Sequence, residues 1–416
     1  MKLLIHDLKD EDIKAFGEFE GWETVSDDGT INPCVGCFCC WHKDPGQCVV
    51  RDGYENMGAL IHRAEEVRVI SRYTYGGFSG FVKNVFDRSL GYVLPQLTLA
   101  GTETHHKKRY EEDKPFSFIF YGRGLGDDEK KSAERYVTAV CANIRGHVEE
   151  LRFVETEECA PQPSETDAAS FDQASDGSPS DPCDNAPGWE DTSDNAPGRE
   201  AQSPESSGKV LLINASMRSE NGNSAKLAQR LADMLTASSV IAALKDYRKD
   251  PLPLVRQAEN ASALVLCMPL YVDGLPSQLI RFMEYFEKEY KGTPKKVYAV
   301  ANMGLYESSQ LVNLFDAVRQ WCVCCGLEYC GAFGVSAGEL IGTFMEHVPM
   351  DFWPGKKAAK GLQTFADAIN GGRGAGSILT EPWAFPRGLY LAVVNINWNK
   401  LARKNGLKPR DLYRQL

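Results

Sequence analysis

The chain has no long hydrophobic run, although 43% of its 416 residues are hydrophobic. No apolar stretch reaches the roughly 18 to 20 residues needed to cross a bilayer. Its start, Met1 to Asp7, reads as a first strand rather than a secretion signal. The sequence therefore predicts a cytoplasmic protein that does not associate with membranes, and its length predicts two or three domains.

Evenly spaced cysteines are also missing. The 13 cysteines cluster instead of spreading along the chain. A disulfide framework would need regular spacing and an oxidising compartment, whereas the cytosol keeps thiols reduced and available to metals. The cysteine usage therefore favours reduced or metal-bound thiols.

An excess of basic charge is missing too, since the formal net charge is −11. Residues 155–208 hold 14 acidic residues and one basic residue, a charge of −13, so the remainder is near +2. We therefore expect no nucleic-acid partner. The acidic segment is rich in Pro, Ser, Asp and Gly and repeats Asp-Asn-Ala-Pro-Gly at 184–188 and 194–198. Such a composition predicts a disordered tether, with an acidic interaction tail as the alternative.

On both sides of this segment, short apolar β-branched runs alternate with helical patterns, which predicts an α/β fold with parallel sheets. Helices are expected to begin near residues 55, 81, 128, 223, 278 and 309. The expected strands are residues 2–6, 67–71, 116–121 and 148–154 before the acidic segment, and 210–214, 240–244, 263–268, 296–301 and 329–335 after it.

The two halves resemble each other over residues 72–87 and 269–284, which align without a gap. Gly77 then stands opposite Gly274, and Asp87 opposite Glu284. This correspondence indicates an internal duplication. Convergence on a generic strand-turn-helix is the alternative.

The second half lacks both a P-loop and a G-x-G-x-x-G motif. After its first expected strand comes a loop of small and polar residues, 214–224, that runs directly into a helix. Backbone N–H groups converge on an anion at such a helix N-terminus, and side chains add donors. We therefore predict a mononucleotide phosphate site, with a capped helix after a polar turn as the alternative. The candidate donors are Ser216, Arg218, Ser219, Asn223 and Ser224.

The sequence Ala215-Ser-Met-Arg-x4-Asn-Ser224 resembles the Gly-Ser-Pro-Arg-x4-Asn-Ser loop of the flavodoxin-like NADPH-dependent FMN reductases. Residues 269–277 and 302–307 are similar to the same family. The resemblance implies FMN as cofactor, NAD(P)H as co-substrate, and flavodoxin-like, doubly wound, five-stranded sheets in the order 2-1-3-4-5. It also implies that these two segments border the flavin ring through Pro269, Leu270, Tyr271, Asp273, Gly274, Asn302, Gly304 and Tyr306.

Three segments follow from these patterns. We expect a flavodoxin-like domain at 1–154, the disordered acidic linker at 155–208, and an FMN-binding reductase domain at 209–416 that ends in a packed helical extension. The first domain has a degenerate phosphate loop, because the charged stretch 9–14 follows its first strand and offers acids where a phosphate needs donors. Residues 105–110 are expected in a long basic loop that either is solvated or approaches the cofactors.

The first half instead carries Cys34-x2-Cys37-x2-Cys40-x7-Cys48. Three cysteines at overlapping spacing and a fourth nearby supply the four thiolates of a ferredoxin-type cluster, while zinc sites more often use two separate knuckles. A reduced cysteine loop without metal is the third interpretation. The spacing is similar to the Cys-x2-Cys-x2-Cys-x4-7-Cys motif of the iron-sulfur flavoproteins, which implies a [4Fe-4S] cluster beside FMN.

Together these features predict an FMN-dependent NAD(P)H oxidoreductase or electron-transfer flavoprotein, with or without a [4Fe-4S] cluster, that reduces a small-molecule or protein acceptor. No acid-base pair stands out, so no catalytic residue is assigned. The first half is expected to dock on the second as a pseudo-dimer, with a homodimer as the alternative. A flavin redox sensor or electron-transfer adaptor without turnover, and a plain flavin or quinone reductase without a cluster, are the competing functions.

Overall fold

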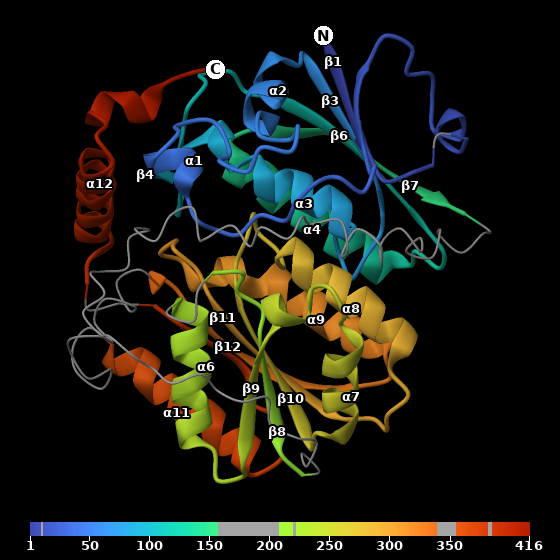
Figure 1. Cartoon of the computed structure of the whole chain (residues 1–416), viewed down its shortest axis with the longest axis vertical. Coiled ribbons are helices and arrows are strands. Elements are labelled where there is room, and N and C mark those ends of the chain that lie inside the picture. The colour runs from blue at the N-terminus through green and yellow to red at the C-terminus, as the bar shows by residue number, and fades with distance from the viewer. Residues whose placement is uncertain (10, 157–207, 219–221, 339–354, 382–384) are drawn as a thin grey trace.

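The computed structural model describes residues 1–9, 11–156, 208–218, 222–338, 355–381 and 385–416. The predicted linker lies outside the described residues, apart from its two ends. Figure 1 shows two α/β halves, the first above the second, with the C-terminal helix running alongside. The prediction of an α/β fold with parallel sheets is confirmed.

The first half is built on a five-stranded parallel sheet in the order β2-β1-β3-β6-β7. This is the predicted 2-1-3-4-5 order. The expected strand at residues 2–6 is present with the predicted ends, and those expected at 67–71, 116–121 and 148–154 are each longer by one residue at each end. The fifth strand of the sheet is the short one that follows β1. The strands are β1 (Lys2–His6), β2 (Glu23–Ser26), β3 (Glu66–Arg72), β6 (Pro115–Gly122) and β7 (His147–Glu155).

Four helices belong to this half: α1 (Cys39–His42), α2 (Met57–Arg63), α3 (Gly80–Arg88) and α4 (Asp127–Ile144). An antiparallel hairpin, β4 (Val93–Ala100) and β5 (Glu103–Lys108), forms a separate two-stranded sheet. The expectation of a long basic loop at 105–110 is therefore wrong for its first part. Ladder pairing at Thr98 with His105 and at Leu97 with His106 holds these histidines in the hairpin.

The second half has a six-stranded parallel sheet, not the five strands expected. Its order is β13-β12-β11-β10-β8-β9, which is 2-1-3-4-5 with a sixth strand added next to β12. The strands are β8 (Val210–Asn214), β9 (Ser239–Ala243), β10 (Ala263–Pro269), β11 (Lys296–Asn302), β12 (Glu328–Val335) and β13 (Gly376–Thr380). The extra strand escaped prediction because Gly376 to Thr380 is short and its exposed face gives it no apolar run.

The helices of the second half are α6 (Asn223–Met234), α7 (Leu252–Asn260), α8 (Ser277–Glu289), α9 (Val312–Cys324), α11 (Lys356–Asn370) and α12 (Arg387–Lys404). Short 3-10 turns at Ile13–Ala15, Leu90–Tyr92, Leu244–Tyr247, Ser308–Leu311 and Pro409–Tyr413 complete the described elements. The predicted helical extension is present in α12 and the final turn. It packs on the first half, where Asn395 donates to and accepts from the backbone of Leu97 at 3.1 and 2.7 Å.

The two halves pack through the segments that align in sequence. α3 and α8 face each other between the sheets (Figure 1). The Asp87 carboxylate accepts the backbone N–H of Ser277, the first residue of α8, at 3.1 Å. In the reverse sense, a Cβ built at Gly80, the first residue of α3, would lie 3.5 Å from the Glu284 carboxylate. Equivalent residues thus make reciprocal contacts, as they do across an isologous two-fold interface.

Tyr136 of α4 lies between the two equivalent turns. A Cβ at Gly77 would stand 2.8 Å from one edge of its ring, and a Cβ at the equivalent Gly274 would stand 2.9 Å from the other edge. Both glycines close the same tight turn, because Thr74 and Gly77 exchange two backbone hydrogen bonds, as do Tyr271 and Gly274. The shared turn and the reciprocal packing are what an internal duplication would produce.

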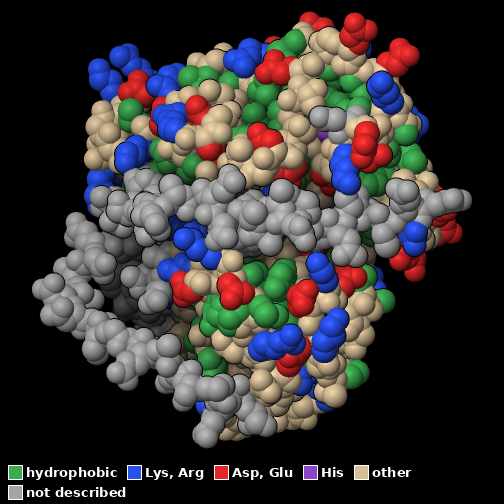
Figure 2. All heavy atoms as spheres, turned by 45° about the vertical axis from the view of Figure 1, so that its right-hand side comes forward, with side chains coloured by type: hydrophobic (Ala, Val, Ile, Leu, Met, Phe, Trp, Pro, Cys, Tyr) green, Lys and Arg blue, Asp and Glu red, His purple; other side chains and the backbone are tan. Residues whose placement is uncertain are grey.

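Surface charge is mixed on the face in Figure 2, where acidic and basic side chains alternate over both halves. None of the helices within the described ranges combines the length and the apolar character that crossing a membrane requires.

Candidate functional site

The candidate site forms where three strands of the second sheet end next to one another. Strands β8, β10 and β11 are adjacent, so the loops that follow them meet at one sheet edge. The Asn302 side chain donates to the Ser224 hydroxyl at 2.7 Å, and the Leu270 N–H donates to the Asn302 carbonyl at 2.8 Å. The structure therefore brings the three predicted loops into direct contact.

The loop after β8 is ordered by its own polar groups. The Ser216 N–H donates to the Asn214 side chain at 3.1 Å, and the Arg218 N–H donates to the Ser216 hydroxyl at 3.3 Å. Ser216 and Ser224 are both buried. Asn223 begins the 12-residue helix α6 and donates to the Gly338 carbonyl at 2.9 Å. These groups surround the N-terminus of α6, and the predicted Ser219 lies outside the described residues.

The loop after β10 is a tight turn with two non-glycine residues in the left-handed region, Val272 at φ 38° and Asp273 at φ 57°. Such backbone is costly and is held here by the paired hydrogen bonds between Tyr271 and Gly274. The Tyr271 hydroxyl and one Asp273 oxygen are buried and have no hydrogen-bond partner among the described residues. Burial raises the pKa of Asp273 to about 7, against a hydrogen bond from Asn143.

The loop after β11 turns partly toward the C-terminal extension. The Tyr306 hydroxyl donates to the Phe385 carbonyl at 2.9 Å, and the Gly304 carbonyl accepts from Tyr390 of α12. Within this predicted group, Asn302 therefore contacts Ser224 of the candidate phosphate loop directly. Gly304 and Tyr306 are tied to the C-terminal extension.

The cysteine loop of the first half reaches this edge from the other side. At Gly36, whose φ is +67°, a Cβ would lie only 1.9 Å from the Tyr271 hydroxyl and 3.6 Å from Cγ of Arg218. The Arg218 guanidinium also lies 5.6 Å from the ring centre of Phe38, within cation-π range. The packing of the two halves thus places the cysteine loop against the turn after β10 and the loop after β8.

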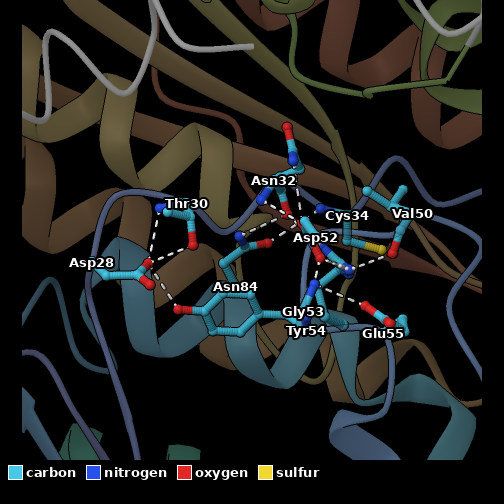
Figure 3. Close-up of polar contacts among 11 residues, drawn as sticks. Asp28, Thr30, Asn32, Cys34, Val50, Asp52, Gly53, Tyr54, Glu55 and Asn84 are labelled. Atoms are coloured by element: carbon cyan, nitrogen blue, oxygen red, sulfur yellow. Dashed lines mark hydrogen bonds and ion pairs between the residues drawn. The ribbon is translucent and has the colours of Figure 1, made fainter. Parts of the chain in front are cut away.

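A network of polar contacts shapes the base of the cysteine loop (Figure 3). The Asp52 carboxylate accepts the Asn32 N–H at 2.8 Å and pairs with the buried guanidinium of Arg88 at 2.8 Å. The Asn84 side chain accepts the Cys34 N–H at 3.2 Å. Because Asn84 also accepts from Ser277 at 3.3 Å, α3 connects the cysteine loop to the second half.

The four cysteines Cys34, Cys37, Cys40 and Cys48 are all partly buried and are not disulfide-bonded. Burial raises the pKa of the Cys34 and Cys40 thiols, and the other members of the group raise both further. In the described part of the chain, no three His, Cys, Asp or Glu side chains lie close enough together to hold a single metal ion.

Cationic and aromatic groups surround these cysteines. Arg109 is buried and donates to the backbone carbonyls of Gly91, Leu412 and Arg414 at 2.6 to 2.7 Å, so the C-terminal tail helps to hold it. It opposes the rise in the pKa of Cys40. Trp41 stacks on Phe38 at 5.1 Å, and burial lowers the pKa of His42 to about 4, which keeps that ring neutral.

The corresponding edge of the first half is arranged differently. Asp7 follows β1 and is partly buried, and both of its carboxylate oxygens accept the Arg72 N–H at 3.1 Å. A carboxylate therefore stands near the strand ends where a phosphate would need donors.

The comparisons with known proteins address this second half. Residues 208–325 match the model of NADPH-dependent FMN reductases. That segment contains the loop after β8, the turn after β10 and the loop after β11. This segment is therefore similar in sequence to the NADPH-dependent FMN reductases. The similarity indicates an NAD(P)H-dependent oxidoreductase.

Solved structures of similar proteins each cover 33 to 40% of the chain. An NADH:FMN oxidoreductase in its apo form is 18% identical, covers 40% of this chain and 90% of its own, and has a TM-score of 0.32. An azoreductase from Bacillus anthracis str. Sterne is 16% identical and covers 39% and 99%, with a TM-score of 0.29. The Trp repressor binding protein from Bacillus subtilis is 18% identical and covers 33% and 92%, with a TM-score of 0.27. Among curated protein sequences, none matches this chain.

Several residues of the site were not among the sequence candidates. Gly338 lies in the loop after β12, and its carbonyl accepts from Asn223. Gly36 and Phe38 come from the other half, and Asn214 precedes the predicted donors. The positive φ of Gly36 is visible only in the fold, whereas Asn214 stands at a strand end and was open to prediction.

Proposed function

We propose that the chain is an FMN-dependent NAD(P)H oxidoreductase with one flavin site, located at the junction of its two halves. The observation that carries the proposal is the family match over residues 208–325, because the matched segment contains the three loops that meet at one sheet edge. When bound, FMN accepts a hydride from the nicotinamide and passes electrons to an acceptor.

The residues present fit the phosphate of FMN. Ser216, Arg218, Asn223 and Ser224 gather at the N-terminus of α6, where N–H groups and the helix dipole favour an anion. Ser219 is part of the proposed set by its place in the motif. The buried Tyr271 hydroxyl, which has no partner among the described residues, fits a group that lies against the turn after β10.

The ring of FMN is proposed to lie between the turn after β10, residues 269–274, and Asn302 at the end of β11. Gly304 and Tyr306 would then support the ring through the backbone, since their polar groups are bonded to the C-terminal extension. The cysteine loop at Gly36 would close the site from the first half. Shielding the ring from water in this way suits a hydride transfer.

We further propose that Cys34, Cys37, Cys40 and Cys48 hold a [4Fe-4S] cluster. The support is that all four cysteines are partly buried on one loop, that Cys37 and Cys48 both raise the pKa of Cys34 and of Cys40, and that the guanidiniums of Arg88 and Arg109 interact with members of the group. A cubane of four irons is wider than a single ion, so its thiolates need not be in mutual contact. Cationic neighbours would favour the negative charge of such a centre.

Domain boundaries at 154 and 209, a cytoplasmic location and an intramolecular pseudo-dimer are part of this proposal. The reciprocal contacts of α3 and α8 support the pseudo-dimer, because one chain already supplies both partners of the interface. A homodimer is then not needed to complete the site.

Anaerobic purification with flavin, iron and sulfide analysis tests the proposal. We expect FMN in the wild type and at least a tenfold weaker FMN affinity after Ser216→Ala with Arg218→Ala. Arg373→Ala, which removes an exposed arginine of the same half, should leave FMN binding unchanged. Unchanged FMN affinity in the double variant would show that the phosphate site is misassigned.

The iron and sulfide content tests the cluster separately from the flavin site. We expect about four irons and four sulfides per chain, lost in Cys37→Ser and retained in Cys324→Ser, which changes an exposed cysteine of α9. Bound flavin without iron and sulfide would show that the protein has no cluster and would favour a plain flavin or quinone reductase. Flavin binding without oxidation of NADH or NADPH by any acceptor would favour a redox sensor or adaptor.

A further inference from the structure

The C-terminal helix α12 has an unusual solvent-facing side. Leu389, Val393 and Ile396 are 50%, 42% and 54% exposed, and they are spaced at i, i+4 and i+7, so they form one stripe. Lys400, Arg403 and Lys404 follow on the exposed side of the same helix. We call these six residues the α12 outer face.

This surface belongs to a strongly basic part of the chain. Residues 387–416 hold seven Lys and Arg side chains and one acidic side chain, a formal charge of +6, whereas the whole chain has −11. An apolar stripe bordered by cations is the composition of a small docking surface, with the apolar part providing contact area and the charges guiding approach.

The helix is held firmly against the first half. The Arg387 guanidinium donates to the Thr102 carbonyl at 2.7 Å, next to the turn of the β4-β5 hairpin. Asn395 pairs with the backbone of Leu97, and Asn405 at the end of the helix lies 3.1 Å from Nδ1 of His42. α12 runs beside the first half in Figure 1. Its outer face is therefore a fixed surface, as docking requires.

The inner side of α12 contacts the cysteine loop. Trp398 is buried, with its ring 5.3 Å from that of Trp41 and 5.8 Å from that of Phe38. Trp41 itself lies in the same short helix as Cys40. A helix with its side chains is about 10 to 12 Å across. A protein seated on the outer face would thus stand about one helix diameter from the cysteine loop.

We propose that the α12 outer face is a docking surface for a small acidic protein that carries single electrons. This inference rests on the proposed function, and it names the acceptor class. The reaction balances with two carriers: one NAD(P)H is oxidised to NAD(P)+ and releases one proton, while two ferric carriers each gain one electron. The limited area of the stripe suits electron-transfer complexes, which are small and short-lived.

Two haem proteins of similar size and opposite charge test this, cytochrome b5 as the acidic carrier and cytochrome c as the basic one. Binding is measured first, by calorimetry at low ionic strength with the oxidised protein, because it needs no turnover. We expect cytochrome b5 to bind and cytochrome c to bind at least tenfold more weakly. Lys400→Glu with Arg403→Glu and Lys404→Glu should weaken cytochrome b5 binding at least tenfold.

A matched variant on another helix controls for net charge. Lys356→Glu with Lys357→Glu and Lys360→Glu changes three exposed lysines of α11 by the same total charge. We expect it to keep cytochrome b5 binding within about twofold. Equal losses in the two triple variants, or no loss in either, would overturn the docking surface.

NAD(P)H-driven reduction is measured next, with a neutral quinone as the small acceptor. The α12 variant should lose at least tenfold in kcat/KM for cytochrome b5 at low ionic strength and keep its rate with the quinone. Because its charges no longer attract the acidic carrier, its kcat/KM for cytochrome b5 should depend less on salt than that of the wild type. If α12-dependent binding holds but quinone and cytochrome are both left unreduced, the proposed function fails and the docking surface stands. If the quinone is reduced but cytochrome b5 is not, the proposal that the α12 outer face binds a single-electron carrier is wrong.

The apolar stripe gives an independent check. Val393→Asp with Ile396→Asp should weaken cytochrome b5 binding without changing the oligomeric state measured by light scattering. If the wild type is a dimer and this variant a monomer, a second copy of the chain covers the face and the proposal is wrong. Binding of the wild type to anionic lipid vesicles with loss in the same variant would also contradict it.

Discussion

The contact between Gly36 and Tyr271 offers a sharp test of how the two halves meet. Gly36 has a φ of +67°, and a Cβ there would lie 1.9 Å from the Tyr271 hydroxyl and 2.9 Å from its ring carbon Cζ. Gly53 also has a positive φ, +91°, but a Cβ there meets nothing within 4 Å. Comparing Gly36→Ala with Gly53→Ala therefore separates the cost of backbone strain from the cost of steric conflict between the halves.

The expected free energies follow from these two terms. A left-handed conformation costs a residue with a Cβ about 1 to 2 kcal/mol, so Gly53→Ala should destabilise the protein by that amount. Gly36→Ala carries the same strain plus overpacking against a buried ring, which adds about 1 to 3 kcal/mol. Tyr271→Phe removes the nearest atom and leaves Cζ, so Gly36→Ala with Tyr271→Phe should recover part of the added loss.

Urea unfolding followed by tryptophan fluorescence measures these differences, and a double-mutant cycle between the two positions gives the coupling. The cycle should show Gly36→Ala to be less damaging in the Tyr271→Phe background. If Gly36→Ala costs no more than Gly53→Ala, the cysteine loop does not lie on the flavin loop. The proposed closing of the site by the first half would then be refuted.

Three further outcomes test the interface. Since burial raises the pKa of Asp273 to about 7 from 3.8, the folded state binds a proton more tightly, so stability should fall by up to about 4 kcal/mol as pH rises from about 4 to about 7. Unfolding measured at several pH values should show this slope, lost in Asp273→Asn and kept in the exposed control Asp246→Asn. Glu284→Gln removes the charged partner of Arg72 in a partly buried ion pair, whose side chains are 25% and 12% exposed, and should cost about 1 to 3 kcal/mol in urea unfolding; no measurable cost would contradict the ion pair. Asn395→Ala removes two hydrogen bonds to β4 and should cost about 1 to 3 kcal/mol and speed hydrogen exchange in α12, while unchanged exchange would mean that other contacts hold the helix.

Much of the fold was predictable from local sequence patterns. Strands such as Lys2–His6 and Val210–Asn214 agree with the sequence prediction at both ends, because continuous apolar runs between polar turns are typical of buried parallel strands. β2 and β13 were not located in advance. Both are short, and β13 has exposed residues, so pairing with a neighbouring strand rather than composition makes them strands.

The candidate site was also only partly predictable from the sequence. The position of the loop after β8 was predictable, because Ser216 to Ser224 combines a strand end, small polar residues and a helix start within one short segment. The turn after β10 was predictable from its likeness to residues 72–87. The roles of Gly304 and Tyr306 were not, because their partners, Tyr390 and Phe385, lie about 80 residues further along the chain.

By itself, the sequence determined the two α/β halves, the likeness between residues 72–87 and 269–284, the position of the loop after β8 and the spacing of the four cysteines. These depend on local order along the chain: apolar periodicity, turn residues and neighbours a few positions apart. Only the tertiary structure decided that Gly36 meets Tyr271, that Tyr136 sits between two equivalent turns, and that α12 covers the cysteine loop. Such contacts join residues far apart in sequence, and they are fixed by the packing of α3 on α8, which no local pattern encodes.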